Sequence, residues 1–217
     1  MYKILIACEE SQEVTKAFRE LGYEAYSCDL QSCSGGHPEW HIQGDAISES
    51  YSGKYDLMVA HPPCTYLSKA GARWMHSGGR INEQRFAKAM EAKEFFLNLL
   101  NAPIKHIAVE NPFPLKVCGL PKESQTIQPY QFGEPFSKKT LLWLKNLPPL
   151  NHTSIVKDYK PLVKSNTGGK KRGQIARPNN LTAKETSKTF RGIAKAMAEQ
   201  WSLVLTKAQP IGYAVGG

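Results

Sequence analysis

An α/β fold with a mostly parallel sheet is the fold class that the sequence predicts, and three observations support it. Residues 3–8 form a short apolar segment, residues 13–21 carry apolar side chains at helical spacing, and residues 24–28 form a second strand-like segment. Gly22 follows the helical segment and is typical of a residue that ends a helix. A strand–helix–strand opening implies a right-handed crossover and parallel pairing. The 217 residues, 41% of them hydrophobic, are enough for one sizeable domain.

The rest of the chain continues this alternation of strands and helices. Short apolar runs predict further strands, and longer runs with helical periodicity predict further helices. Thr182 and Glu185 have the spacing of a capping box, which marks the start of the last helix. Strands are expected over 55–60, 104–109 and 140–144, helices over 83–100 and 182–205, loops over 31–41, 66–80 and 115–131, and a short turn at 44–46.

The stretch that ends at Cys64 organises the functional interpretation. Residues 55–60 form a buried strand, and Pro62 and Pro63 end it, because neither can donate to a sheet ladder and each fixes φ. A stiff loop at the end of a buried strand commonly carries functional residues, so we interpret Cys64 as a nucleophile and not as a small buried apolar residue. Glu110 follows the next predicted strand. Because parallel strands end at one edge of a sheet, the two side chains are expected near each other.

A thiolate beside a carboxyl group suits attack on an electron-poor aromatic ring. The thiolate adds to the ring, and the carboxyl group hydrogen-bonds the ring nitrogen that gains electron density. The sequence places no histidine as a base for Cys64, since His61 is close in sequence but its ring can point in any direction. Asp29 follows the second strand, where a carboxylate commonly accepts hydrogen bonds from ribose hydroxyls. These residues predict a nucleoside-containing cofactor beside a heterocyclic substrate.

The composition of the chain limits the kinds of binding partner and the cellular location that we expect. The net charge of +9 and the pI near 9.3 favour an acidic partner, and nucleic acid is the commonest one. Five scattered cysteines and the lack of a signal peptide favour reduced thiols in the cytoplasm. No apolar run approaches the roughly 20 residues of a membrane span. Cys28, Cys33, His37 and His41 match no closed zinc pattern, so no metal site is expected.

Several motifs follow one another in the order and approximate spacing of a known enzyme family. They are Gly44-Asp45, Pro62-Pro63-Cys64 with Ser68 and Ala70-Gly71 behind it, Glu110-Asn111, Phe132-Gly133-Glu134-Pro135 followed by Lys138-Lys139, and Asn179-Asn180. Over residues 3–200 the sequence thereby resembles the cytosine carbon-5 DNA methyltransferases. The resemblance implies a Rossmann-like fold that uses S-adenosylmethionine, within a single methyltransferase-like domain over residues 1–217.

The resemblance also implies a role for each motif. Cys64 would attack carbon 6 of a cytosine in DNA, Glu110 would protonate or hydrogen-bond ring nitrogen 3, and carbon 5 would take the methyl group. A cytosine inside a duplex would first be flipped out, at a cost of a few kcal/mol. Lys138 or Lys139 stands where the family uses arginine, and Lys139 is assigned to the catalytic group. The residues expected to contact the cofactor are Glu9, Ser11, Asp29, Asp45, Pro62 and Asn180.

Two regions depart from the family pattern. The turn over 8–12 has no glycine, and Glu9 or Glu10 either pairs with the ammonium group of the cofactor or is an ordinary acid in the first turn of a helix. The segment over 151–180 reads as a basic loop insertion, too short and polar for a target-recognition domain.

The substrate is accordingly expected to be duplex DNA, single-stranded DNA or a free cytosine nucleotide. A catalytically silent nucleic-acid-binding relative is the remaining alternative. A small basic enzyme of this kind suits a phage or mobile element, in the cytoplasm of a bacterial or phage-infected cell.

Overall fold

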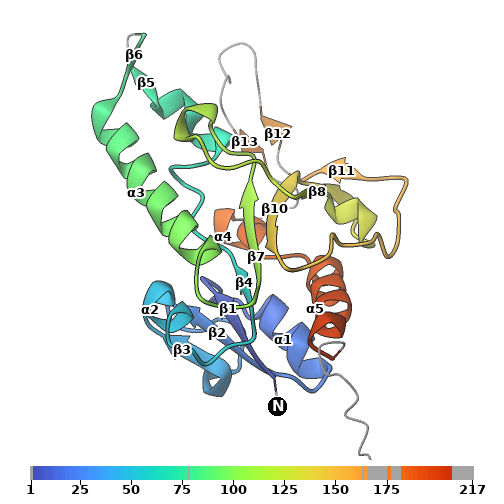
Figure 1. The fold of residues 1–217 in the computed structure, drawn as a ribbon. Helices are drawn as coiled ribbons and strands as arrows, with labels where there is room; N and C mark the ends of the chain where they lie inside the picture. The colour runs from blue at the N-terminus through green and yellow to red at the C-terminus, as the bar shows by residue number, and fades with distance from the viewer. Residues whose placement is uncertain (1, 78, 163, 166–174, 177–181, 207–217) are drawn as a thin grey trace, which may run out of the picture.

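A seven-stranded sheet forms the centre of the molecule (Figure 1). The strands of this sheet are β1 (Lys3–Ala7), β2 (Glu24–Asp29), β3 (His41–Gln43), β4 (Leu57–Ala60), β7 (His106–Pro112), β8 (Gln125–Ile127) and β10 (Thr140–Lys145). Their order is β3-β2-β1-β4-β7-β10-β8, and β10 is antiparallel to both neighbours while the other pairs are parallel. The computed structural model describes residues 2–77, 79–162, 164–165, 175–176 and 182–206.

The predicted fold class is confirmed: the chain has a Rossmann-like α/β fold with a mostly parallel sheet. The helices that accompany the sheet are α1 (Glu13–Glu20), α2 (Ala46–Ser50), α3 (Glu83–Leu100), α4 (Ala183–Ser187) and α5 (Arg191–Thr206). α1 and α5 lie side by side on one face, and α2 and α3 pack on the other (Figure 1). The result is three layers, with helices on both faces of the sheet.

β4 illustrates how the two cores are separated. Leu57 and Val59 point into the core under α1 and α5, whereas Met58 and Ala60 point into the core under α2 and α3. All four side chains are fully buried, because β4 lies between β1 and β7 in the middle of the sheet. A strand buried on both faces requires a continuous apolar run, which explains why this segment could be recognised in the sequence.

Most predicted elements agree with the structure. α3 has the predicted bounds, and the side chain of Asn82 caps it by accepting a hydrogen bond from the Arg85 N–H at 3.1 Å. Gly22 adopts φ +85° just after α1, as expected of a helix-ending glycine. The Thr182–Glu185 capping box is present at the start of α4. Local signals therefore fixed these boundaries correctly.

Three predictions were wrong, and one strand was missed. The turn at 44–46 opens α2, the expected loop over 115–131 contains β8, and the expected loop over 31–41 is followed by β3, which was not predicted. β3 and β8 were missed because each has three residues and no apolar run. The expected single helix over 182–205 is two helices. Lys188 is extended and ends α4, and α5 begins anew at Arg191.

The remaining elements are short, and all except β9 lie wholly or partly in segments that the sequence predicted as loops. They are the 3-10 helices η1 (Pro38–Trp40), η2 (Lys69–Trp74), η3 (Lys116–Cys118) and η4 (Pro129–Gln131), and the two-residue strands β5 (His76–Ser77), β6 (Arg80–Ile81), β9 (Phe136–Ser137), β11 (Lys160–Pro161), β12 (Lys164–Ser165) and β13 (Ile175–Ala176). In the predicted basic insertion, β11 pairs with β9, while the basic run at 168–172 lies outside the described residues. Within the described part of the chain, no helix is long and apolar enough to cross a bilayer.

Candidate active site

The carboxyl ends of β4 and β7 bring His61 and Glu110 together. Ala60 is the last residue of β4 and pairs with Val109, so the next residue on each strand is His61 and Glu110. The Nδ1 atom of His61 lies 3.1 Å from Oε2 of Glu110, and the two side chains are only 12% and 16% exposed. The sheet register, and not the nearby sequence, therefore determines where the His61 ring points.

Burial and charge act in opposite directions on this pair. Burial disfavours the His61 imidazolium, but the hydrogen bond and charge of Glu110, with the charge of Glu9 beyond it, raise the pKa of His61 above its ordinary value. Burial also disfavours the Glu110 carboxylate, but His61 and then Lys138 hold the pKa of Glu110 below its ordinary value. The favoured state is a buried ion pair.

Cys64 lies in a short loop that is tied to the segment after Glu110. Its carbonyl oxygen accepts hydrogen bonds from the N–H groups of Leu67 (3.2 Å) and Ser68 (2.9 Å). Leu67 in turn accepts a bond from the Leu115 N–H at 2.7 Å, and Ser68 forms an isolated bridge with Pro114. These contacts hold the cysteine loop against the chain that leaves β7.

The thiol of Cys64 is the resting form. Burial raises its pKa, and the negative charge of Glu110 raises it further, while Lys138 and a hydrogen bond from Ser68 act in the opposite direction. The effect of the Glu110 charge on the pKa of Cys64 agrees with the expectation that both residues lie at one edge of the sheet.

Lys138 and Lys139 take different positions. Lys138 lines a small cavity together with Glu110 and donates from Nζ to the Thr186 carbonyl oxygen at 3.0 Å. Lys139, the residue assigned from the sequence, lies with Nζ 4.9 Å from the centre of the Phe113 ring. Lys138 is thus the lysine whose charge acts on Glu110 and Cys64.

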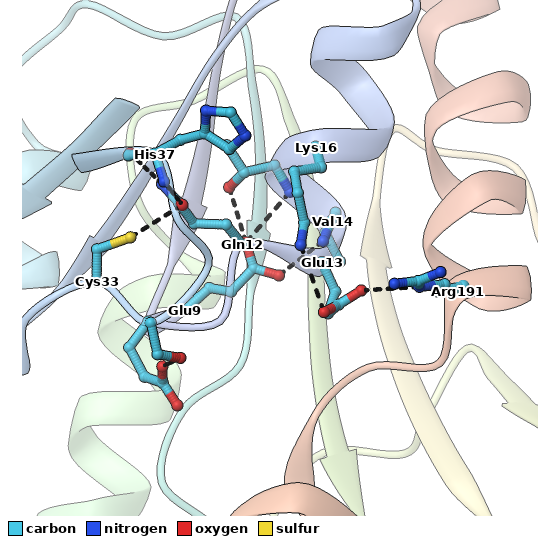
Figure 2. Close-up of polar contacts among 11 residues, drawn as sticks. Glu9, Gln12, Glu13, Val14, Lys16, Cys33, His37 and Arg191 are labelled. Atoms are coloured by element: carbon cyan, nitrogen blue, oxygen red, sulfur yellow. Dashed lines mark hydrogen bonds and ion pairs between the residues drawn. The ribbon is translucent and has the colours of Figure 1, made fainter. Parts of the chain in front are cut away.

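The turn between β1 and α1 has the backbone shape of a glycine-rich turn without its glycines. Cys8 and Gln12 both adopt left-handed conformations, with φ of 60° and 58°, and such positions cost of order 1 kcal/mol or more for a residue other than glycine. The Glu9 carboxylate turns into the protein, where it accepts hydrogen bonds from the N–H groups of Val14 (2.7 Å) and Thr15 (3.2 Å) (Figure 2). It thereby caps α1, and its own pKa is raised by burial.

Gln12 fastens the loop after β2 onto this turn. Its amide nitrogen donates to the His37 carbonyl oxygen at 2.8 Å, and its amide oxygen accepts from the His37 N–H at 3.1 Å and from Cys33 Sγ at 2.9 Å (Figure 2). Gly35 packs so closely that a Cβ there would lie 2.5 Å from Gln12 Cβ and from the Ser11 carbonyl oxygen. Ser11 and Gln12 are buried in this contact.

The other residues assigned to the cofactor are spread along the same edge. Asp29 ends β2, and its carboxylate accepts a hydrogen bond from the Gln31 N–H at 2.8 Å. Asp45 is the N-cap of α2, and its carboxylate accepts from the N–H groups of Ile47 and Ser48. Pro62 is buried directly after His61. Asn180 lies outside the described residues.

The end of β2 and the turn between β1 and α1 fit a nucleoside-containing cofactor. Asp29 keeps carboxylate oxygen capacity for a ribose diol, and the left-handed backbone at Cys8 and Gln12 gives the tight turn that nucleotide-binding βα units need. The side chains of Glu9 and Gln12 point into the protein and so do not block the edge. Among the described residues, no cluster of three His, Cys, Asp or Glu side chains could hold a metal ion.

No protein-family model and no curated protein matches the chain. Among solved structures, it is similar to a DNA modification methyltransferase encoded within an E. coli prophage (10% identity, TM-score 0.42, covering 66% of this chain and 46% of that one). It is also similar to the Dnmt2 methyltransferase of S. pombe (15%, 0.39, 69% and 50%) and the methyltransferase EhMeth of Entamoeba histolytica (14%, 0.45, 72% and 58%). The chain thus spans roughly half the length of these proteins, and such identities and TM-scores assign neither family nor activity.

His61 and Lys138 are the site residues that the sequence did not assign. His61 directly follows a buried strand, which was a signal, but its partner depends on the register between β4 and β7. Lys138 and Lys139 are adjacent in the sequence, and the structure places Lys138 beside Glu110 and Lys139 over the Phe113 ring.

Proposed function

We propose that the protein transfers a methyl group from S-adenosylmethionine to carbon 5 of cytosine in DNA, through a covalent adduct with Cys64. The observation that carries the proposal is the joint anchoring of Cys64 and Glu110. Backbone contacts tie the loop that carries Cys64 to the segment after β7, and the charge of the buried Glu110 carboxyl group acts on the thiol. A soft nucleophile and a carboxyl group at one sheet edge match the needs of addition to a pyrimidine.

The proposed reaction uses these two residues in sequence. Cys64 loses its proton and its sulfur bonds to carbon 6, while Glu110 gives a proton to ring nitrogen 3, so that electron density moves to carbon 5. Carbon 5 then takes the methyl group. Removal of the proton from carbon 5 and elimination of Cys64 restore the aromatic ring and release the methylated base.

S-adenosylmethionine, when bound, supplies an electrophilic methyl group. Asp29 is the residue that would accept hydrogen bonds from its ribose hydroxyls. Asp45, Ser11 and Pro62 remain proposed contacts at the same edge, although the carboxylate of Asp45 already caps α2. The Glu9 carboxylate caps α1 and so supports the turn. This favours a structural role for Glu9 over contact with the cofactor.

Cations held over aromatic rings support DNA as the substrate. Nζ of Lys69 lies 4.1 Å from the centre of the Phe113 ring, on which Lys139 also lies, and Arg85 lies 5.0 Å from the ring of Tyr66. Lys69 and Tyr66 belong to the loop that follows Cys64, so these charges flank the proposed nucleophile. Phosphate groups beside a bound cytosine are the natural partners of such charges.

The test is transfer of a labelled methyl group to duplex DNA, single-stranded DNA and dCMP. Label in DNA that disappears in Cys64→Ser but persists in the control Cys33→Ser is the expected result. Serine at position 33 keeps the hydrogen-bond donor to Gln12, so the control isolates the nucleophile. Label in dCMP alone would overturn DNA as the substrate.

A second candidate function is nucleic-acid binding without methyl transfer. The lack of glycine in residues 8–12 is the observation that favours it, because nucleotide-binding turns commonly use glycine where the backbone approaches the ligand. Calorimetry separates the two candidates. Binding of S-adenosylmethionine that is lost in Asp29→Ala supports the enzyme, and binding of DNA with no binding of the methyl donor supports the silent relative.

A further inference from the structure

We propose that His61 is a positioning residue that stores, through its contact with Glu110, the proton that Glu110 gives to the substrate ring. This inference rests on the proposed function and assigns a role to a residue outside the motifs on which that proposal depends. Its basis is geometric: His61 is the immediate register neighbour of Glu110, with Nδ1 3.1 Å from Oε2.

The pair belongs to a row of charged side chains that crosses three adjacent strands. Glu9 follows β1, His61 follows β4, and Glu110 lies on β7, the order in which these strands stand in the sheet. The charges that act on the His61 ring are those of Glu110, Glu9 and Lys138, two acids and one base. Two carboxylates around one buried ring favour its protonated form.

The Nε2 atom of His61 marks the ring as more than a packing residue. It is buried and has no hydrogen-bond partner among the described residues. A buried ring nitrogen without a partner is costly, so a histidine that served only the fold would be expected to use both nitrogens. Here only Nδ1 is engaged, and it is engaged by the carboxyl group that must handle a proton.

The proton balance is closed within the pair. In the resting site the proton lies on Nδ1 and Glu110 is a carboxylate. As cytosine docks, the Nδ1 proton passes to Glu110, which leaves His61 neutral. As the bond between Cys64 and carbon 6 forms, Glu110 gives this proton to ring nitrogen 3, and the thiol proton goes to water. When Cys64 is eliminated, nitrogen 3 returns the proton to Glu110 and His61 recovers it.

An NMR titration of the histidine rings tests the pair in the intact protein. The signal of His61 is assigned by its loss in His61→Gln, and the other histidines serve as internal references. We expect the His61 midpoint above its ordinary value of about 6.5, and lower by about one unit or more in Glu110→Gln. A wild-type midpoint below 6.5 overturns the proposal without any variant at position 110. So does a midpoint that is unchanged in a folded Glu110→Gln protein.

Exchange of the carbon-5 hydrogen of cytosine in DNA tests the role in the reaction. Reversible addition of Cys64 to carbon 6 releases this hydrogen to water without a methyl donor. We expect His61→Gln to lower the exchange rate at pH 7.5 roughly 10- to 100-fold, with a smaller loss at pH 5.5, where solvent can protonate Glu110 directly. KM for DNA should stay within about twofold, since the loss is assigned to proton transfer. The control is the exposed His152→Gln.

The two proposals fail in different ways. Exchange in the wild-type protein that is equally fast in His61→Gln at both pH values overturns the role of His61 and leaves the proposed function standing. A wild-type protein that exchanges no hydrogen and methylates no DNA overturns the proposed function, and the role of His61 with it.

Discussion

The edge around Cys64 and Glu110 and the turn between β1 and α1 lie at the same end of the sheet, yet they use their polar side chains differently. At the Cys64 edge, His61 Nε2 and both polar side-chain atoms of Asn111 are buried without a partner among the described residues. In the turn, Glu9 accepts three hydrogen bonds and Gln12 takes part in four.

This difference separates a site organised for a ligand from a segment organised for its own stability. Polar groups left unpartnered in a buried site cost free energy, which a substrate can recover. In the turn, by contrast, the hydrogen bonds stabilise the left-handed conformations of Cys8 and Gln12. The Cys64 edge is thus specified by side-chain chemistry, and the turn between β1 and α1 by backbone shape.

Loss of the acid at the Cys64 edge should have the largest effect. Glu110→Gln removes the proton donor and should lower methyl transfer by roughly 10²- to 10⁴-fold, with the fold retained. The control is Glu94→Gln on the exposed side of α3. Equal activities for the two variants, measured under single-turnover conditions, would remove Glu110 from the chemistry.

Breaking the buried ion pair should cost about 3 kcal/mol of unfolding free energy, because one charge loses its partner. Glu110 has a lowered pKa, so its contribution is present above its unfolded value and is lost as pH falls through its folded value. His61 has a raised pKa, so its contribution is present below its unfolded value and is lost as pH rises through its folded value. The difference between wild type and His61→Gln should therefore be greatest between about pH 4.5 and 6.5.

Urea unfolding at several pH values measures this window, with His152→Gln as the matched variant. A difference that stays constant from pH 4 to pH 9 would mean that His61 contributes packing and no charge.

Overpacking the turn should have an intermediate effect. Gly35→Ala forces a Cβ to within 2.5 Å of Gln12 and Ser11 and should cost about 2 kcal/mol. Gly44→Ala is the control, because a Cβ there meets nothing within 4 Å. The midpoint temperature of unfolding and the affinity for S-adenosylmethionine should both fall in Gly35→Ala and stay unchanged in Gly44→Ala. Equal behaviour of the two variants would show that the loop after β2 does not support the turn.

The smallest effect is expected away from both regions. Thr182→Ala removes the N-cap of α4 and should cost about 1 kcal/mol. Because Lys138 donates to the carbonyl oxygen of Thr186 at the end of the same helix, a loosened α4 should also release Lys138. Thr182→Ser is the control variant for Thr182→Ala, since serine keeps the hydroxyl oxygen that caps the helix. A Thr182→Ala protein as stable as Thr182→Ser would exclude a stabilising cap.

The elements that could be predicted from the sequence are those that local interactions determine. The apolar run of β4, the periodicity of α3 and the capping box at Thr182 lie within a few residues of the elements they define. The elements that could not be predicted depend on contacts with segments that are distant in the sequence. β3 owes its existence to pairing with β2, and the break between α4 and α5 does not interrupt the apolar periodicity along the chain.

The site divides in the same way. Cys64 and Glu110 were predictable because strand ends in a parallel sheet share an edge. The partner of His61 depends on the register between β4 and β7, and the different positions of Lys138 and Lys139 depend on how the chain runs between β9 and β10. Neither is recorded in the neighbouring residues of the sequence.

The most direct measurement is trapping with DNA that contains 5-fluorocytosine. Fluorine at carbon 5 cannot leave as a proton does, so the adduct with Cys64 persists after methyl transfer. With S-adenosylmethionine present, we expect a denaturation-resistant protein–DNA complex whose modified peptide contains Cys64, and none with Cys64→Ser. A folded wild-type protein that binds this DNA and S-adenosylmethionine but forms no covalent complex would exclude Cys64 as the nucleophile.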